Sequence, residues 1–358
     1  MNKGKERRNR TGTEGSDHGA HAPTEGTQRE SSARTQRADT PNVYVVGYED
    51  IGDFHPRIPS FRRAHNTSVA TLWKNGEPQH FGDGKTETSA YSVFVSGGDV
   101  YMSGSQGDHP VLWKNGEVQR LDGPSQVSAE SVFVSGGDVY VAGTESKMAG
   151  CCILDYALAL LWKNGELTRL GDGITKTSAY SVFVSDGDVY VAGSLGNHAV
   201  LWKNGVAERL SDEGANHARA RSVFVLGGDV YAAGEQDNRA ALWKNGEAQC
   251  LSGGGVYCWA DSVFVSGADV YVVGHATNAL GNRMAMLWKN GVAQRLSDEG
   301  VHHAMAKSLF VRGGDVYVLT REVRDQDSGV AFYLYKNGSA TRIGDGSHEM
   351  SAYAVFVE

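Results

Sequence analysis

One short motif recurs seven times along this chain of 358 residues, and its spacing limits the possible folds more than any other feature. Six copies read Leu-Trp-Lys-Asn-Gly and the seventh reads Leu-Tyr-Lys-Asn-Gly. The central aromatic residues follow one another at intervals of 40 to 49 positions: Trp73, Trp113, Trp162, Trp202, Trp243, Trp288 and Tyr335. A period of about 40–50 residues with strand-like patterning is typical of β-propellers, in which each repeat supplies one blade.

Each repeat carries the signals for four short strands. In one copy, the apolar run Ser181–Val184 is followed by a turn cluster and then by a second run at Val189–Gly193. A third run ends at Trp202, and Lys-Asn-Gly leads into Val206–Leu210. Asn-Gly between two such runs favours a tight hairpin, because both residues tolerate positive φ. The repeat therefore predicts one antiparallel blade, with strands a, b, c and d from the inside outward.

The two ends of the repeat region are complementary parts of one repeat. Residues 42–47 match strand b without a preceding strand a, and residues 352–357 match strand a without a following strand b. Pairing them would complete a blade and protect two open strand edges. The sequence thus predicts an all-β, seven-bladed β-propeller over residues 42–358, closed by pairing the C-terminal strand with the N-terminal blade.

The repeat pattern A-x-S-V-F-V-S-G-G-D-V-Y-V-A-G, followed by L-W-K-N-G, resembles the WD-repeat. This pattern differs from the WD-repeat in two respects: the opening Gly-His pair is absent, and Lys replaces Asp after each Trp. The closer resemblance is to bacterial repeat propellers of the HAF type, and it covers nearly all of residues 42–358. This resemblance implies the fold and little about activity, because propellers serve as binding modules and as enzymes.

The N-terminal segment, residues 1–41, differs from the repeats in composition. It is rich in Gly, Ser, Thr, Arg and Glu and has almost no large apolar side chain, which predicts a disordered polar tail. It carries 8 basic and 6 acidic residues of the chain's 34 and 42, so the propeller region has 26 basic and 36 acidic residues, a net charge of −10. This acidic body argues against specific nucleic-acid binding.

Compartment and assembly are expectations from what the sequence contains. No apolar signal segment is recognisable near Met1, and no run of about 18 apolar residues occurs. We therefore expect a cytoplasmic monomer without a membrane span, or an exported protein if the true N-terminus differs. Cys250 and Cys258 flank one loop, where they either pair or serve as small apolar side chains; no zinc spacing occurs, and no metal or cofactor is predicted.

Sequence variation is concentrated on one face of the predicted ring. The a–b and c–d turns share one face and are short and nearly identical, whereas the b–c and d–a connections share the other, the variable face. The three largest b–c insertions are residues 48–70, 144–158 and 320–332. Loops on a rigid scaffold are where binding residues usually lie.

A second variable position lies inside strand a, directly after an alanine that all seven copies keep. Because strand a is innermost, we predict that these side chains ring the mouth of the central channel, together with two residues that precede the alanine. They are Tyr91, Glu130, Tyr180, Arg221, Asp261, Lys307 and Tyr353, with Arg219 and Trp259. The alternative is drift at a tolerant, solvated position.

The residues that recur in every repeat are interpreted as structural. A Trp at one fixed place in each blade is expected to pack between blades. The recurring turn aspartates, such as Asp188, are expected to accept hydrogen bonds from turn backbone N–H groups. No complete catalytic motif occurs.

The leading functional hypothesis is a non-enzymatic binding scaffold that recognises a protein or a glycan through the variable face. The alternative is a hydrolase or lyase at the channel mouth, with Glu130, Asp261 and nearby histidines as acid or base. A third possibility is a structural spacer.

Overall fold

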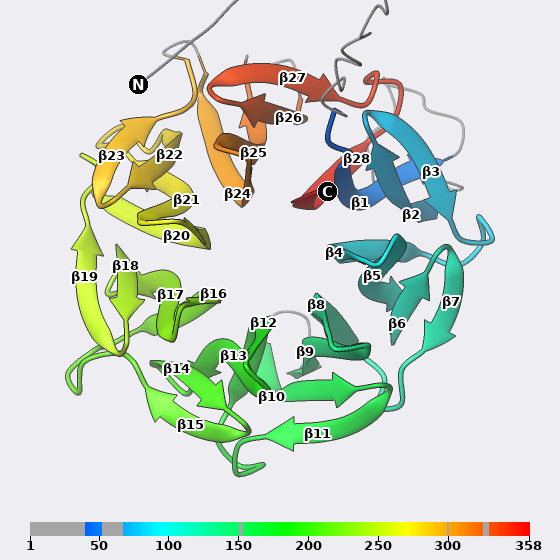
Figure 1. Cartoon of the computed structure of the whole chain (residues 1–358), viewed down its shortest axis with the longest axis horizontal. Coiled ribbons are helices and arrows are strands. Elements are labelled where there is room, and N and C mark those ends of the chain that lie inside the picture. Colours follow the sequence, from blue (N-terminus) through cyan, green and yellow to red (C-terminus); the bar gives the residue numbers. More distant parts are fainter. Residues whose placement is uncertain (1–39, 52–66, 150–152, 299–300, 325–328) are drawn as a thin grey trace, which may run out of the picture. The chain divides into compact units, whose positions relative to one another are not determined.

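The computed structural model describes residues 40–51, 67–149, 153–298, 301–324 and 329–358. Within these ranges the regular elements are strands, and they form seven four-stranded sheets arranged around a common axis (Figure 1). The predicted seven-bladed β-propeller is confirmed. The predicted tail, residues 1–41, lies outside the described residues except for its last two positions.

The blades are numbered here in chain order, each from its innermost strand outward. Blade 1 consists of β28 (Met350–Val357), β1 (Val43–Ile51), β2 (Thr67–Lys74) and β3 (Glu77–Phe81). Blades 2 to 4 consist of β4 (Thr88–Ser96), β5 (Asp99–Gln106), β6 (His109–Lys114), β7 (Glu117–Arg120); β8 (Val127–Ser135), β9 (Asp138–Ala149), β10 (Ile153–Lys163), β11 (Glu166–Leu170); and β12 (Thr177–Ser185), β13 (Asp188–Leu195), β14 (His198–Lys203), β15 (Val206–Arg209). Blades 5 to 7 consist of β16 (Ala218–Leu226), β17 (Asp229–Gln236), β18 (Arg239–Lys244), β19 (Glu247–Leu251); β20 (Tyr257–Ser266), β21 (Asp269–Thr277), β22 (Arg283–Lys289), β23 (Val292–Arg295); and β24 (His303–Arg312), β25 (Asp315–Val323), β26 (Ala331–Lys336), β27 (Ser339–Ile343).

The ring closes by pairing the two ends of the repeat region, as predicted. β28 runs antiparallel to β1, with Val43 opposite Val357 and Glu49 opposite Met350. Two further backbone hydrogen bonds of 2.9 Å join Asn42 and Glu358 in both directions. In Figure 1 the red β28 lies beside the blue β1, so the C-terminal strand becomes the inner strand of the first blade.

The Asn-Gly turns have the conformation that the sequence predicts. In all seven Lys-Asn-Gly turns the asparagine has φ between 50° and 53°, and the glycine has φ between 79° and 90°. Positive φ at both central residues is the mark of a type I′ hairpin, whose twist matches that of the flanking strands. The motif therefore sets the sharp c–d turn of every blade.

The recurring aspartates bind side chains rather than turn backbone, so that interpretation was wrong. In blade 4, Asp188 accepts a hydrogen bond from Asn204 Nδ2 at 2.7 Å and pairs with Lys203 Nζ at 2.8 Å. Asn204 Oδ1 in turn accepts from the Val189 N–H at 2.8 Å. The same cluster recurs in blades 2, 3, 5, 6 and 7. Strand b begins beside the c–d turn, so the aspartate meets the Lys-Asn pair across the hairpin.

The repeated tryptophans pack between blades, as expected. Trp243 of blade 5 is 1% exposed and belongs to one apolar cluster with Tyr190, Leu201 and Leu210 of blade 4. In blade 7, Tyr335 takes the same place against Tyr271 of blade 6. Burying a large aromatic side chain at each junction contributes several kilocalories per mole of hydrophobic stabilisation, in the range of about 1.5–3 for a fully buried side chain.

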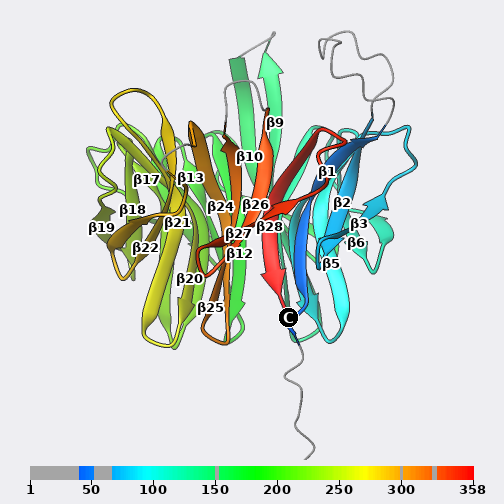
Figure 2. The ribbon, with the colours of Figure 1, turned by 90° about the horizontal axis from the view of Figure 1, so that it is seen from above.

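The three largest insertions of the variable face differ in how much of each one the structure describes as strand. Residues 144–149 and 153–158 belong to strands: β9 and β10 continue as a paired hairpin that extends beyond the neighbouring strands, opposite the face where β28 ends (Figure 2), and residues 150–152 lie outside the described residues. In the insertion 48–70, β1 reaches Ile51 and β2 begins at Thr67. In 320–332, β25 ends at Val323 and β26 begins at Ala331. The remainders of both lie outside the described residues.

Two smaller points concern cysteines and membrane spans. Cys250 and Cys258 are both free, the first exposed and the second buried in the core between blades 5 and 6. Cys258 thus has the role of a small apolar side chain.

Across the described ranges, we find no helix whose length and apolar character would suffice to cross a membrane.

Candidate functional site

The inner strands line the channel with three layers of side chains. The lowest layer, which is the one farthest from the variable face, is apolar. One phenylalanine from each blade contacts its two neighbours, with ring centroids 4.6–5.1 Å apart. Together they form a closed phenylalanine ring: Phe94, Phe133, Phe183, Phe224, Phe264, Phe310 and Phe356. The sequence analysis missed this ring, although its signal was the Phe common to every A-x-S-V-F-V frame. This ring surrounds the channel axis with seven apolar side chains below the mouth.

The middle layer is a ring of serines that joins neighbouring blades. Ser92 Oγ accepts a hydrogen bond from the Val132 N–H of the next blade at 3.2 Å. The same bond recurs at the next five junctions, with lengths of 3.1–3.4 Å. A register shift beside each of these serines, between the conserved alanine and the serine, marks a β-bulge. The last copy has Ala354 in place of the serine.

The upper layer contains the residues that the sequence proposed as a channel-mouth ring. All nine are half-buried, and the seven that follow the conserved alanine lie at the bulge of the inner strand. Several touch across blade boundaries: the Tyr91 and Tyr353 rings are 5.3 Å apart, and the Arg221 guanidinium lies 6.0 Å from the Tyr180 ring. The structure therefore brings Tyr91 next to Tyr353, and Arg221 next to Tyr180 and Trp259.

Tyrosines form one arc of the mouth. The ring of Tyr353 lies 5.3 Å from that of Tyr91 and 6.3 Å from that of Tyr48, which sequence reasoning missed because it lies on strand b. A 3.1 Å hydrogen bond links the Tyr91 hydroxyl to Ser105. Burial raises the pKa of both Tyr91 and Tyr353, so their hydroxyl groups stay protonated at neutral pH. This tyrosine arc offers aromatic faces and O–H groups.

Glu130 lies next to the tyrosine arc in the ring. Burial raises the pKa of its carboxyl, and a hydrogen bond with Ser128 opposes that rise only in part. The side chain is therefore a carboxyl group that favours its neutral form more than an ordinary glutamate does.

Arg221 begins the charged arc and is already engaged. Its guanidinium donates two hydrogen bonds to Glu235, Nε to Oε2 at 2.7 Å and Nη2 to Oε1 at 3.0 Å. The Glu235 side chain is only 2% exposed, and His217 Nε2 lies 3.7 Å from its Oε1. Because a bidentate pair of this kind fixes both groups, Arg221 stiffens the mouth while three of its five N–H donors remain outside this pair.

Asp261 continues the charged arc on blade 6. Its Oδ2 lies 3.5 Å from His275 Nδ1, and the His275 ring packs edge-on against Trp259 with centroids 5.0 Å apart. Burial raises the pKa of Asp261, but the contact with His275 and the positive charges of Lys307 and Arg221 outweigh it, so the pKa is lowered overall. Asp261 is therefore ionised at neutral pH, in contrast to the tendency of Glu130.

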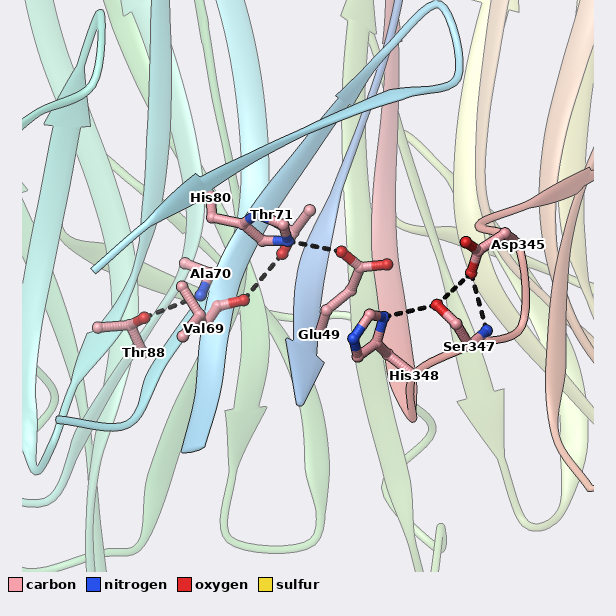
Figure 3. Close-up of polar contacts among 9 residues, drawn as sticks. All are labelled: Glu49, Val69, Ala70, Thr71, His80, Thr88, Asp345, Ser347 and His348. Atoms are coloured by element: carbon pink, nitrogen blue, oxygen red, sulfur yellow. Dashed lines mark hydrogen bonds and ion pairs between the residues drawn. The ribbon is translucent and has the colours of Figure 1, made fainter. Parts of the chain in front are cut away.

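A second polar region lies outside the mouth, between β1–β3 and the segment that joins β27 to β28 (Figure 3). Glu49, whose side chain is 9% exposed, pairs with His80 Nε2 at 2.7 Å. Ser347 Oγ contacts Asp345 Oδ1 at 2.5 Å and His348 Nδ1 at 2.7 Å. These residues line a cavity of about 330 Å³ together with Arg342.

The other contacts drawn in Figure 3 are structural: Thr88 accepts from the Ala70 N–H at 2.8 Å, and Thr71 donates to the Val69 carbonyl at 2.9 Å. In the part of the chain that the structure describes, no three histidine, cysteine or acidic side chains are grouped so that they could hold a metal ion.

These features define a seven-bladed β-propeller with a variable, half-buried channel mouth. No protein family model matches the chain, and no curated protein matches its sequence. Solved structures resemble it in fold. A chain of the nidogen/laminin complex is 8% identical with a TM-score of 0.44, and the match covers 88% of this chain and 98% of that one.

Two peptidases also resemble it. A prolyl endopeptidase is 12% identical with a TM-score of 0.48, covering 87% of this chain and 50% of its own. A puromycin-hydrolysing peptidase of Mycobacterium tuberculosis is 9% identical with a TM-score of 0.54, covering 83% and 53%. This chain thus spans about half the length of each peptidase, and at such identities the likeness concerns the fold alone.

Proposed function

We propose that this propeller is a non-enzymatic binding scaffold that recognises a protein or a glycan through the variable face, with the ligand at the channel mouth. One observation carries the proposal. The phenylalanine ring and the serine layer are nearly the same in every blade, whereas the layer above them changes from blade to blade while staying half-buried. Aromatic and cationic side chains on a rigid frame are good anchors for a ligand.

The opposite face supports the same proposal by contrast. In six blades the aspartate, lysine and asparagine of that face bind one another, with Lys–Asp distances of 2.7–2.9 Å. Its repeated charges therefore pair with each other within each of these six blades. We also propose, on the repeat pattern alone, that the chain is related to bacterial HAF-type propellers.

The experiment probes the full chain with a glycan array and with a phage-displayed random peptide library. The mouth variant combines Tyr91→Ala, Tyr180→Ala and Lys307→Ala, and leaves the Arg221–Glu235 pair intact. The control combines Val118→Ala and Val206→Ala, which are 52% and 68% exposed on outer strands. We expect bound glycans or peptides to be lost in the mouth variant and kept in the control. Equal binding by all three proteins would refute a site at the mouth.

A second candidate is a hydrolase or lyase at the mouth, favoured by the opposite pKa shifts of Glu130 and Asp261. A carboxyl group whose pKa is raised and one whose pKa is lowered can serve as acid and base when a substrate contacts both. The two residues belong to blades 3 and 6, so a substrate would have to bridge the mouth. Release of reducing ends from a polysaccharide panel by the full chain, abolished in both Glu130→Gln and Asp261→Asn, would establish catalysis.

A further inference from the structure

In blade 6, three buried polar atoms on neighbouring residues of the two inner strands have no hydrogen-bond partner. They are Trp259 Nε1, Asp261 Oδ2 and His275 Nδ1, and each is buried from solvent. Buried polar atoms are almost always hydrogen-bonded in folded proteins, because leaving one unpaired disfavours folding. Trp73, Trp202 and Trp243 Nε1 are also buried and unpaired in the core, but among the described residues only in blade 6 are a carboxylate oxygen and an imidazole nitrogen unpaired on residues next to the tryptophan.

The strand register brings the three side chains together. Trp259 on β20 lies opposite His275 on β21, and Asp261 follows at the bulge between Ala260 and Ser262. The His275 side chain is only 5% exposed, and its Nδ1 lies 3.5 Å from the Asp261 carboxylate, which is too long for a good hydrogen bond. Asp261 is 14% exposed and Trp259 is half-buried, so both side chains keep some surface that a ligand could contact.

The donor and acceptor types limit what could satisfy this cluster. The indole N–H can only donate, an ionised carboxylate can only accept, and a neutral imidazole offers one nitrogen of each kind. Adjacent hydroxyl groups, each a donor and an acceptor, match that set.

The charges around the cluster further limit the class of ligand that could bind there. Arg221 lies 5.9 Å from the Trp259 ring, and Lys307 acts electrostatically on Asp261, so a cationic ligand is disfavoured. The Asp261 carboxylate disfavours an anionic one.

We propose that blade 6 forms a sugar subsite of the mouth, where Trp259 and Asp261 hydrogen-bond neighbouring hydroxyl groups of a neutral saccharide, with His275 Nδ1 3.5 Å from the carboxylate. The tyrosine arc across the mouth packs against the C–H faces of the same glycan. The inference rests on the proposed function and selects glycan over protein as the ligand class. Because these atoms are buried in the structure, binding requires Trp259 and Asp261 to rotate toward the hydroxyl groups.

The test uses isosteric variants of the full chain on an array of neutral oligosaccharides and matched uronic acid oligosaccharides, followed by calorimetry on the best binder. Trp259→Phe removes the N–H donor and keeps an aromatic ring, and Asp261→Asn removes the charge. The matched control is Trp202→Phe, because Trp202 Nε1 is also buried and unpaired but lies in the core between blades 3 and 4. We expect about a tenfold loss of affinity or more in each mouth variant and no more than about a twofold change in the control.

Several outcomes separate this inference from the proposed function. Glycan binding that is equal in all variants, or selection of uronic acid oligosaccharides only, overturns the sugar subsite and leaves the mouth proposal standing. Selection of peptides in place of glycans also overturns it. Circular dichroism checks folding; if Trp259→Phe unfolds, Asp261→Asn decides alone. If the triple variant Tyr91→Ala, Tyr180→Ala, Lys307→Ala binds glycans and peptides as well as the unmodified chain does, the proposed function itself is refuted.

Discussion

Tyr335 replaces the tryptophan of the other six repeats, and a buried glutamate accounts for the exchange. Glu322 is fully buried and accepts hydrogen bonds from Tyr335 Oη at 2.7 Å and Thr320 Oγ1 at 3.0 Å. Arg324 Nε adds an ion pair at 3.0 Å. An indole in this place could donate only from Nε1, whereas the phenol hydroxyl reaches the carboxylate. The deviation from the repeat is therefore one half of a matched polar pair.

Removing that hydroxyl should destabilise the chain. Tyr335→Phe keeps the packing against blade 6 but takes one partner from buried Glu322, so we expect a loss of about 1–3 kcal/mol in the free energy of unfolding. Urea denaturation of the full chain measures it. Tyr333→Phe is the matched control, because the Tyr333 ring contacts Arg324 at 4.0 Å through its face and keeps that contact. Equal stabilities for the two variants would contradict the role given to the hydroxyl.

Ala354 marks the one blade junction at which the serine layer lacks its serine. At the other six junctions a serine Oγ accepts from a backbone N–H of the next blade, and the equivalent N–H after Ala354 belongs to Val93. We expect Ala354→Ser to complete the ring and raise the free energy of unfolding by about 0.5–1.5 kcal/mol. Ser308→Ala should lower it by a similar amount. A destabilised Ala354→Ser variant in thermal denaturation would show that the seventh junction has a different geometry.

At the scale of the hairpin, the Asp–Lys–Asn cluster makes each blade sensitive to acid. Hydrogen bonds from lysine and asparagine hold the pKa of these aspartates below the ordinary value, as for Asp188 with Lys203 and Asn204. A carboxylate whose pKa is lower in the folded state stabilises that state above its unfolded pKa, about 3.9, and loses this contribution as pH falls through the folded value. The aspartate side chains are 38–41% exposed, so each contribution is modest and screened by salt.

We therefore expect the melting temperature to change little between pH 7 and about 5 and to fall below about pH 4. Asp188→Asn should lower the melting temperature at neutral pH, because it removes the Lys203 pair, and should reduce the difference between pH 7 and pH 3. Thermal scans across this range at low salt provide the measurement. A variant whose melting temperature changes with pH as the unmodified chain does would show that Asp188 does not titrate differently on folding.

The elements that the sequence predicted correctly are those encoded by local chemistry. Asn204-Gly205 specifies a type I′ turn by itself, and the split repeat at residues 42–47 and 352–357 specifies the closure. Partners that meet across strands or blades could not be predicted in this way. The frame shows that Phe183 is apolar but not that it touches Phe133 and Phe224, and the turn at Asp188 conceals its contact with Lys203.

Some residues of the candidate site could also be found from the sequence, and others could not. The position after each alanine identified Tyr91, Arg221 and Asp261, because repetition exposes the place where copies disagree. Tyr48 and Glu235 escaped notice, since they lie on strand b and meet the inner strand only through strand pairing. The insertion 144–158 was predicted as a loop because its length exceeds that of most other copies, yet its residues 144–149 and 153–158 continue the two-stranded pairing of β9 and β10.

At the scale of the whole molecule, the seven blades form a ring whose last junction depends on one strand. β28 supplies the inner strand of blade 1, including Phe356 of the phenylalanine ring and Tyr353 of the mouth. Removing Ala352–Glu358 would open the edge of β1, break the phenylalanine ring and expose Val45 and Trp73, which pack with Val355 and Val357. An open strand edge also offers a template for association with other chains.

We expect the chain without Ala352–Glu358 to melt well below the full chain and to associate, because it loses burial at two blade junctions as well as the β28–β1 hydrogen bonds. Differential scanning calorimetry with light scattering measures both effects. A synthetic peptide of residues 350–358 should restore the melting temperature in a concentration-dependent way, since a strand supplied in trans stabilises the folded state by mass action. The same peptide with Val355 and Val357 replaced by serine should fail. Identical melting of the truncated and full chains would mean that the six remaining complete blades hold the ring without its clasp.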